Sequence, residues 1–577
     1  MSTPPSSASA WLYCAHGADL TDPVGCRGVH IDGHTACLAH LTDTDRDAYL
    51  ASLAPGADID LRGTPITADL LGRLLQAVRD PATERPRFGR AWFSEAWFCD
   101  EARFGWTQFS DTAAFREARF SGEVWLPDAQ FFGDANFHAA QFCDGAEFSE
   151  AQFSGLASFS QAQLSGIAWF DRTRFSGDVA FEGARFSGNV DFSEAQFLAA
   201  SVWGPVVCGG TVDLSRAVFG APVTLEVSAR QVLCTRTHWQ STATVRVRHA
   251  SVDLGHAVPE APLAITAHPT PFTTANGTIP DESMLPGNEP VRVISVQGVD
   301  AAHLVLTDTD LSDCLFSGAF HLDQLRLEGR TTLASTPTGW HRKGIAPVRW
   351  TRRRTLAEEQ HWRAQTAGQP PVPAGAPPEP RRWRTGPHHP DPARTPDPDD
   401  VAPLYRQLRK AFEDGKNEPG TADFYYGECE MRRHDRTGTP KAERRLLWAY
   451  WLLSGYGLRA GRALGWLAAA MLATIVLLMA FGLPMSSPKQ EATGTVPAGG
   501  GTVTFVIDKQ DVKNPTGDRF TSKRFDKALN VTLNSVVFRS SGQDLTTTGT
   551  YIEMTSRLLE PALLALAVLA IRGRIKR

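Results

Sequence analysis

The sequence predicts a mainly β protein whose largest part is a four-sided β-solenoid, followed by a helical segment and two transmembrane helices. Two observations lead to this fold class. A large apolar residue, most often Phe, recurs at alternating intervals of five and six residues from position 88 to position 197. Two long apolar stretches lie near the C-terminus. At 577 residues the chain is also too long for a single domain.

The overall composition excludes several classes of protein. The chain has 58 basic and 63 acidic residues and a net charge of −5, so it is not a globally basic nucleic-acid binder. A hydrophobic content of 42% is too low for a transporter with many spans, and nine cysteines do not make a disulfide scaffold in a chain of this length. Nucleic acid is therefore not an expected partner.

The N-terminal region, residues 1–85, contains a candidate metal site. Residues 11–40 hold Cys14, Cys26 and Cys37 together with His16 and His40. Because thiolate and imidazole are the ligands that structural zinc prefers, one interpretation is a zinc knuckle formed by the three cysteines and either His16 or His40. The other is a short β-rich cap whose cysteines are simply buried, since no CxxC pair is present. No other cofactor is expected.

One helix is expected between this cysteine-rich segment and the solenoid. Residues 68–80 place five apolar side chains on one face at helical spacing. Pro81 and Pro86 follow and end the helix. The apolar side chains are Leu70, Leu71, Leu74, Leu75 and Val78.

The solenoid region is defined by the repeating unit A-x-F-S-x. Neither a helix nor a flat strand has a period of five to six residues, whereas a chain that turns a corner at each unit does. Four such units, alternately five and six residues long, close one square coil. Each Phe then lies in the core and stacks on its equivalent in the next coil, and successive coils pair as parallel strands. The predicted core includes Phe93, Phe98, Phe104, Phe109, Phe115, Phe120, Phe142, Phe148, Phe153, Phe159, Phe175, Phe181, Phe186, Phe192 and Phe197.

The A-x-F-S-x units, and the variant TDLSD at residues 309–313, resemble the pentapeptide-repeat family of right-handed quadrilateral β-helices. The resemblance covers residues 86–330, with an insertion at about 257–295. It implies a rod without catalytic activity. Some members of the family mimic DNA and occupy topoisomerases, and 16 acidic residues against seven arginines between 88 and 197 permit that role here. Beyond residue 200 the predicted core continues at Trp203, Cys208, Leu214, Phe219 and Leu225 and returns at Leu306, Leu311, Phe316, Leu322 and Leu327.

Three segments connect the solenoid to the C-terminal region. Residues 331–368 are rich in Arg and Trp, which suits either contact with anionic lipid or a helix that caps the open end of the solenoid. Residues 369–400 are rich in Pro and form a solvated linker. Residues 401–440 predict a helical hairpin with its turn at Asn417 to Gly420. This hairpin resembles a juxtamembrane module that precedes two-span segments in some bacterial membrane proteins.

Residues 441–577 predict a two-span membrane region. The stretches Ala463 to Met485 and Leu558 to Ile571 are apolar enough to cross a lipid bilayer. Basic residues flank the start of the first stretch and the end of the second, so both termini are expected in the cytoplasm and loop 486–550 outside it. The expected location is the bacterial inner membrane, with association into homo-oligomers through this region. The flanking basic residues are Arg444, Arg445, Arg459, Arg462, Arg572, Arg574, Lys576 and Arg577.

The loop between the two spans resembles the pore of two-transmembrane potassium channels. A short helix expected over residues 525–538 is followed by Thr547, Thr548, Gly549 and Thr550 and then by the second span. In such pores, backbone carbonyls of T-x-G-Y-G bind the ion, but Thr550 stands where that motif has Tyr. The alternative is a plain two-span anchor. Glu560 lies in the second span and is expected to face a partner helix, an aqueous lumen or the outer headgroups.

The sequence favours a protein that binds rather than catalyses. It contains no Walker A loop, no HExxH and no GxSxG motif, so no enzymatic activity is expected. The leading hypothesis is a membrane-anchored rod whose cytoplasmic solenoid binds another protein, still unknown, with the lipid bilayer as its second partner. The first alternative is a subunit of an oligomeric, channel-like membrane effector. The second is a DNA mimic that binds topoisomerases.

Overall fold

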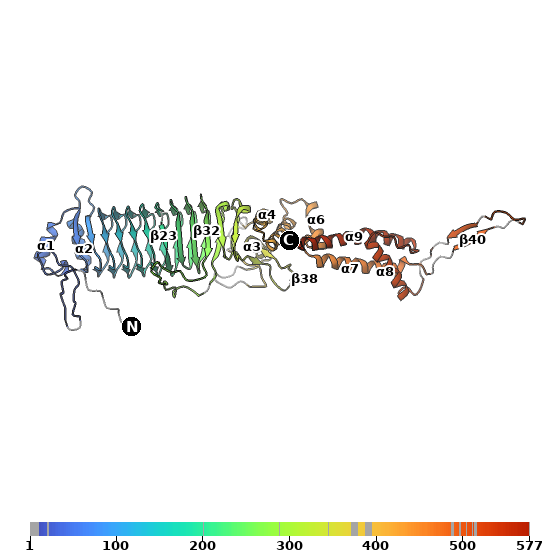
Figure 1. Cartoon of the computed structure of the whole chain (residues 1–577), viewed down its shortest axis with the longest axis horizontal. Helices are drawn as coiled ribbons and strands as arrows, with labels where there is room; N and C mark the ends of the chain where they lie inside the picture. The colour runs from blue at the N-terminus through green and yellow to red at the C-terminus, as the bar shows by residue number, and fades with distance from the viewer. Residues whose placement is uncertain are drawn as a thin grey trace. The chain divides into compact units, whose positions relative to one another are not determined.

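The structure is a computed structural model, and it describes residues 11–19, 22–199, 201–287, 289–343, 346–370, 379–386, 395–485, 490–494, 498–503, 505–509, 512 and 516–575. The chain forms two compact units, Met1–Asn417 and Glu418–Arg577. Figure 1 shows the whole chain. Each unit is described by itself.

The first unit begins with a small cap on the first coil. The cap consists of η1 (Leu38–His40), α1 (Asp43–Ser52), β1 (Ala57–Asp60), β2 (Pro65–Ile66) and α2 (Ala68–Ala77). The side chain of Thr67 accepts a hydrogen bond from the backbone N–H of Leu70 and begins α2, which confirms the predicted helix. Strand β1 pairs in parallel with β3 and β2 pairs with β4, so the cap continues the sheets of the solenoid.

The solenoid is a parallel β-solenoid of about eleven turns, as the sequence predicts, and its turns stack in a row in Figure 1. The hand of the coil stays a prediction. Up to residue 199 each coil has four short strands, and the strands of one face pair in register with their equivalents in the next coil. The first face consists of β3 (Arg87–Trp92), β6 (Gln108–Phe109), β10 (Gln130–Phe131), β14 (Gln152–Phe153), β18 (Arg174–Phe175) and β22 (Gln196–Phe197).

The other three faces repeat this arrangement. The second has β7 (Ala113–Ala114), β11 (Ala135–Asn136), β15 (Ala157–Ser158) and β19 (Val179–Ala180). The third has β4 (Trp97–Phe98), β8 (Arg119–Phe120), β12 (Gln141–Phe142), β16 (Gln163–Leu164) and β20 (Arg185–Phe186). The fourth begins with β5 (Ala102–Arg103), β9 (Val124–Trp125), β13 (Ala146–Glu147), β17 (Ala168–Trp169) and β21 (Val190–Asp191).

Stacked phenylalanine rings fill the interior of the four-strand coils. All fifteen phenylalanines predicted for the core are at most 1% exposed. The ring of Phe115 lies 4.9 Å from that of Phe137 one coil later, with the two planes 1° apart. Small residues such as Ala113 and Ala135 face the same interior and leave room for the rings. The packing confirms that these rings form the core and stack from one coil to the next.

Beyond residue 200 the coils have three strands and a shorter period. Strand β23 (Ser201–Cys208) spans what had been two faces, with an irregularity in its register between Trp203 and Val206. A side chain at Gly204 would collide with the carbonyl oxygen of Glu226, so only glycine fits there. The later strands are β24 (Thr211–Asp213), β25 (Val218–Phe219), β26 (Val223–Ser228), β27 (Gln231–Leu233), β28 (His238–Trp239), β29 (Ala243–Arg248), β30 (Ser251–Asp253), β31 (Val258–Pro259) and β32 (Leu263–Ala267).

The change from four strands to three per coil is also seen in the positions of residues with positive φ. In the four-strand coils two corners of each coil have a residue with positive φ, and after residue 200 one of the two corners is lost. The lost series is Glu95, Glu117, Ala139, Gln161 and Gly183. The retained series is Trp106, Asp128, Glu150, Arg172, Glu194, Arg216, Arg236 and His256.

A loop excursion leaves the solenoid between β32 and β33 (Arg292–Ser295). The predicted insertion, 257–295, is too wide, because strands β31, β32 and β33 lie within those bounds. Glu282 holds the excursion on the coils. Its carboxylate accepts hydrogen bonds from Arg248 at 2.9 and 3.0 Å and from the Ser228 hydroxyl at 2.6 Å.

A polar cap closes the C-terminal end of the solenoid. The last coils carry η2 (Ala301–His303), β34 (Leu304–Thr307), η3 (Leu322–Gln324) and β35 (Arg326–Glu328). The cap that follows contains β36 (Ala334–Ser335), β37 (Trp340–Lys343), β38 (Ala346–Arg349), β39 (Arg354–Thr355), α3 (Ala357–Thr366) and α4 (Pro398–Asp414). The buried carboxylate of Glu358 on α3 accepts hydrogen bonds from the backbone N–H groups of Phe316 and Ser317, in the last coils. A capping helix, one of the two alternatives for residues 331–368, is thus present as α3, and the residues before it form the short strands β36 to β39.

The second unit is helical. It contains α5 (Glu418–His434), α6 (Lys441–Ser454), α7 (Ala460–Leu477), η5 (Leu478–Gly482), a hairpin of β40 (Gln490–Gly494) and β41 (Phe505–Lys509), α8 (Ser522–Val536) and α9 (Thr547–Ile575). Residues 418–420, predicted as a turn, lie in the first turn of α5. Two helices are long and apolar enough to cross a membrane, Ala460–Gly482 and Thr547–Arg572. The second is longer than the predicted stretch because it begins well before Leu558, at Thr547.

Candidate functional site

Because the rings fill the interior, the solenoid presents its chemistry on its outer faces. The fourth face is a nine-stranded parallel sheet that runs from β5 to β33. Its outward residues form a row with one member per coil, each paired in register with the next. In chain order the row is Arg103, Trp125, Glu147, Trp169, Asp191 and Asp213.

The middle of this row combines tryptophan with an excess of negative charge. Trp125 is 39% exposed, and its indole N–H donates to the carboxylate of Glu123 at 3.1 Å. Partial burial and the negative charges of Asp171 and Glu123 together raise the pKa of Glu147. Asp171 also pairs with the exposed guanidinium of Arg172 at 2.8 Å. The acidic–tryptophan face is the group Glu123, Trp125, Glu147, Trp169 and Asp171.

On the first face of the solenoid, outward side chains form hydrogen bonds with their neighbours in the same row. Its outward residues are mostly glutamine, and the side-chain amide of Gln108 donates to that of Gln130 in the next coil at 3.0 Å. Further along, Arg174 donates to Gln196 at 3.2 Å. From Arg87 to Gln196 this glutamine row contains glutamine and arginine but no carboxylate, and its side chains bond to one another, whereas the acidic–tryptophan face keeps like charges side by side.

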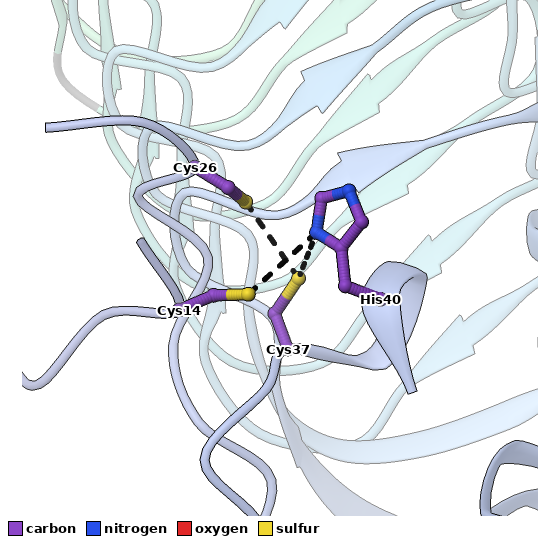
Figure 2. A group of neighbouring side chains, drawn as sticks. All are labelled: Cys14, Cys26, Cys37 and His40. Carbon is purple, nitrogen blue, oxygen red and sulfur yellow. Dashed lines mark hydrogen bonds between the residues drawn. The ribbon is translucent and has the colours of Figure 1, made fainter. Parts of the chain in front are cut away.

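The N-terminal cap brings together the predicted metal ligands. The sulfur and nitrogen atoms of Cys14, Cys26, Cys37 and His40 all lie within 4.8 Å of one another. Figure 2 shows their side chains pointing toward a common centre. The Cys26 and Cys37 sulfurs are 3.7 Å apart, and the His40 Nδ1 lies 3.3 Å from Cys37 Sγ and 3.6 Å from Cys14 Sγ.

Backbone hydrogen bonds hold the four ligands from three short segments. The N–H of Cys14 donates to the carbonyl of Gly28, and the N–H of Cys26 donates to the carbonyl of His16. Cys37 and His40 flank and end η1, whose carbonyls accept from the guanidinium of Arg46. The structure places His40 in the cluster, and the ring of His16 stacks on it at 4.1 Å.

The pore-like residues do not form a filter. Thr547, Thr548, Gly549 and Thr550 make the first turn of α9. The hydroxyl of Thr546 accepts from the N–H of Gly549 at 3.0 Å, which starts the helix there. The resemblance to a channel pore is therefore not confirmed.

Glu560 faces a partner helix, the first of its three expected environments. Its side chain is fully buried between α7 and α9. The hydroxyl of Thr474 on α7 donates to Glu560 Oε1 at 2.8 Å. The short helix expected over residues 525–538 is present as α8.

The acidic–tryptophan face was not identified from the sequence. Its members come from different coils or lie in adjacent turns, so only the register of the coils brings them together. The signal that could have found it is the repetition of large outward residues at positions 125, 147 and 169.

Comparison with known proteins supports the repeat. A family profile described as pentapeptide repeats (9 copies) matches residues 115–163 and 159–204. No curated protein and no solved structure matches the chain. The matched residues are those whose rings stack from one coil to the next, from Phe115 onward. Residues 115–204 of the solenoid are therefore built of pentapeptide repeats.

Proposed function

We propose that the protein is a non-catalytic, membrane-tethered binding protein whose acidic–tryptophan face docks a basic segment of another protein. The observation that carries this proposal is the row Trp125, Glu147 and Trp169, in register on three successive coils. Phenylalanine rings fill the interior of the four-strand coils, and the regular outer rows suit an extended partner.

Charge and ring chemistry indicate the nature of the partner. Guanidinium groups stack on indole rings and form paired hydrogen bonds with carboxylates. The exposed ring of Trp125 lies next to the carboxylates of Glu123 and Glu147, which satisfies both requirements. The raised pKa of Glu147, to which neighbouring carboxylates contribute, supports an excess of negative charge on this surface. A segment rich in arginine or lysine would balance it.

The two apolar helices support the tether. Only about a third of the most apolar part of each is buried in the structure. Leu472 on α7 is 63% exposed and Leu558 on α9 is 79% exposed, which suits contact with lipid chains. The basic residues before α7 and at the end of α9 favour a cytoplasmic location for both termini and for the solenoid.

A binding experiment tests the docking surface. We expect a fluorescein-labelled oligo-arginine peptide to bind the full chain in neutral detergent micelles, with an affinity that falls as salt rises, by fluorescence anisotropy. Glu147→Lys should weaken binding about tenfold or more, because it puts a cation in the middle of the face. Trp125→Ala should weaken it less.

The matched control is Gln130→Lys, which adds a cation to the glutamine row at a similar height along the solenoid. It should change the affinity by less than about twofold. Equal losses in the two lysine variants would contradict the proposed face, and so would binding that does not depend on salt.

A labelling experiment tests the tether and its orientation separately. All nine native cysteines precede residue 430, so Thr502→Cys introduces the first cysteine into the loop between the spans. A membrane-impermeant maleimide applied to intact cells should label this cysteine. The exposed native Cys143 should react only after the cells are permeabilised. Labelling of Cys143 in intact cells would overturn the cytoplasmic placement of the solenoid.

A further inference from the structure

We propose that Cys14, Cys26, Cys37 and His40 bind one structural Zn²⁺ ion that locks the N-terminal cap onto the first coil. The inference is independent of the proposed docking function. It rests on the geometry of the cluster, on the weak core of the segment that contains it, and on the way that segment joins the solenoid.

The distances fit a tetrahedral zinc site. With Zn–S near 2.3 Å and Zn–N near 2.1 Å, a tetrahedron has S–S edges of about 3.8 Å and S–N edges of about 3.6 Å. The observed Cys26–Cys37 sulfur separation is 3.7 Å, and the two distances from sulfur to the His40 nitrogen are 3.3 and 3.6 Å. A disulfide would need about 2.05 Å. Three of the six distances between ligand atoms thus lie close to these tetrahedral edges, and all six are within 4.8 Å.

The composition of the ligand set matches the same ion. Three thiolates and one neutral imidazole form a closed site of the structural type, with no position left for a substrate. Binding exchanges the thiol protons for the metal, and these protons pass to solvent. His40 binds through Nδ1. The ring of His16 stacks on the imidazole of His40 and holds its orientation, so His16 is a positioning residue.

The segment around the cluster has little else to fold it. Over the described residues 11–19 and 22–42, the buried apolar side chains other than cysteine are Val29, Ile31, Leu38 and Leu41. So small a core rarely holds such a segment in one conformation without a cross-link or a metal. A zinc ion would join its three parts at one point.

The site connects directly to the solenoid. The N–H of Val29 donates to the carbonyl of Arg62, and the N–H of Gly63 donates to the carbonyl of Ser94 in the first coil. A side chain at Gly28 would collide with Cys37, so the ligand segments pack tightly against each other. The cap covers the first coil, whose exposed strand edges would otherwise be open to pairing with other chains.

Metal analysis of the purified full chain tests the proposal. Inductively coupled plasma mass spectrometry should find about one zinc per chain, falling below about 0.2 in Cys26→Ser and in His40→Ala. Cys143→Ser, which removes an exposed cysteine of the solenoid, should keep the full amount. His16→Ala should keep zinc but bind it about tenfold more weakly.

Two further measurements keep the proposal falsifiable if a ligand variant misfolds. Cobalt exchanged into the native protein should give the absorption of a tetrahedral, thiolate-rich site. Chelation should open residues 11–42 to proteolysis while the four-strand coils stay resistant. Zinc below about 0.2 per chain in metal-replete wild type, unchanged zinc in Cys26→Ser, or an octahedral cobalt spectrum would each overturn the assignment.

Discussion

The four-strand coils before residue 200 and the three-strand coils after it solve the same packing problem with different side chains. In the first, single Phe rings stack along the axis, and each unit turns a corner after two paired residues. In the second, strands such as β29 alternate inward and outward residues over six positions, and the core is mostly Val, Leu and Ala. Stacked rings require corners, whereas alternating β-branched residues favour a straight strand that removes one.

The change in coil length follows from the lost corner. The positive-φ residues of this corner end with Gly183 and with Gly204 in β23, and β26 then runs straight through the place where the next corner would be. Equivalent positions are 22 apart in the four-strand coils, as in the bonded pair Gln108 and Gln130, and 20 apart in the three-strand coils, as in Glu226 and Arg246. The ring of Trp239 nevertheless stacks on Phe219 and continues the first face across the change.

The largest expected effect is the loss of a stacked ring. Phe159→Ala should destabilise its coil by about 3–5 kcal/mol, because the ring lies between Phe137 and Phe181 and leaves a cavity. Val245→Ala in the three-strand coils removes less volume and should cost about 1–3 kcal/mol. Hydrogen exchange of peptides from the substituted coil measures both.

The matched control for this comparison is Phe132→Ala. Phe132 is 54% exposed and adjoins the buried Phe131, so its removal should change stability by no more than about 0.5 kcal/mol. If Val245→Ala were as costly as Phe159→Ala, the two kinds of core would be equivalent and the comparison would fail.

The end of the three-strand coils depends on a buried ion pair. Glu359 is fully buried and accepts hydrogen bonds from Arg353 and Arg363 and from the hydroxyl of Tyr405. Burial works to raise the pKa of Glu359, but the two guanidinium groups outweigh it and lower that pKa. Glu359→Ala removes the carboxylate that both buried guanidinium groups contact, and we expect it to destabilise α3 and α4 by about 3 kcal/mol.

Thermal unfolding, with proteolysis between α3 and α4 as the local readout, checks this expectation. Glu101→Ala is the control, because it breaks an exposed pair with Arg103 and should cost less than about 1 kcal/mol. Equal melting of the two variants would show that the C-terminal cap does not depend on this cluster.

Low pH should release the loop excursion from the three-strand coils. Burial works to raise the pKa of Glu282, but Arg248, Ser228 and His249 outweigh it and lower that pKa below its usual range. Because the pKa of Glu282 is lower in the folded state, its ionised carboxylate stabilises the fold. This contribution is complete above the pKa of the unfolded state, near 4.3, and is lost as the pH falls through the lower pKa of the folded state. We expect a loss of about 2 kcal/mol.

Hydrogen exchange of the excursion at pH 3 and pH 6, corrected for intrinsic rates, measures this loss. The four-strand coils, which have no such excursion in the described residues, should change less. In Glu282→Gln the difference between the two pH values should disappear. If it persisted, the ion pair would not be what holds the excursion.

The smallest expected effect concerns the corner that only the four-strand coils possess. Ala139 has a φ of 55°, a conformation that costs an alanine about 1 kcal/mol and glycine almost nothing. Ala139→Gly should therefore stabilise the protein by about 0.5 kcal/mol, after the greater flexibility of glycine in the unfolded chain is counted.

A differential thermal melt of wild type and variant reads this small change. Ala135→Gly, in the adjacent buried strand β11, should instead destabilise by about 0.5–1 kcal/mol. A loss of stability in Ala139→Gly would show that this corner tolerates its left-handed residue without strain.

The sequence predicted the four-strand coils well because one residue type carries the core. The spacing of the phenylalanines located every buried ring of the predicted set. The three-strand coils were harder to predict, because after Leu225 the next step of five reaches the exposed Arg230. Their signal is alternation, as in Val245 and Val247, repeated from one coil to the next.

The candidate sites also differ in how well the sequence predicted them. The cysteine cluster was predicted from ligand chemistry, but spacing alone could not choose between His16 and His40, because the choice depends on how three loops fold. The resemblance to a channel pore depended on Thr548 and Gly549. In the structure Gly549 serves close packing: its backbone lies against that of Gly482, and a side chain at Gly549 would collide with the Gly482 carbonyl oxygen.

The constant spacing between coils fixes the distance between the two ends of the solenoid. Parallel strands advance about 4.8 Å per coil, so about eleven turns hold the two capped ends about 50 Å apart. Both four-strand and three-strand coils contribute the same increment, because the spacing comes from backbone pairing and not from coil length. Removing one complete coil would shorten the distance between the two caps by about 4.8 Å and leave both caps intact.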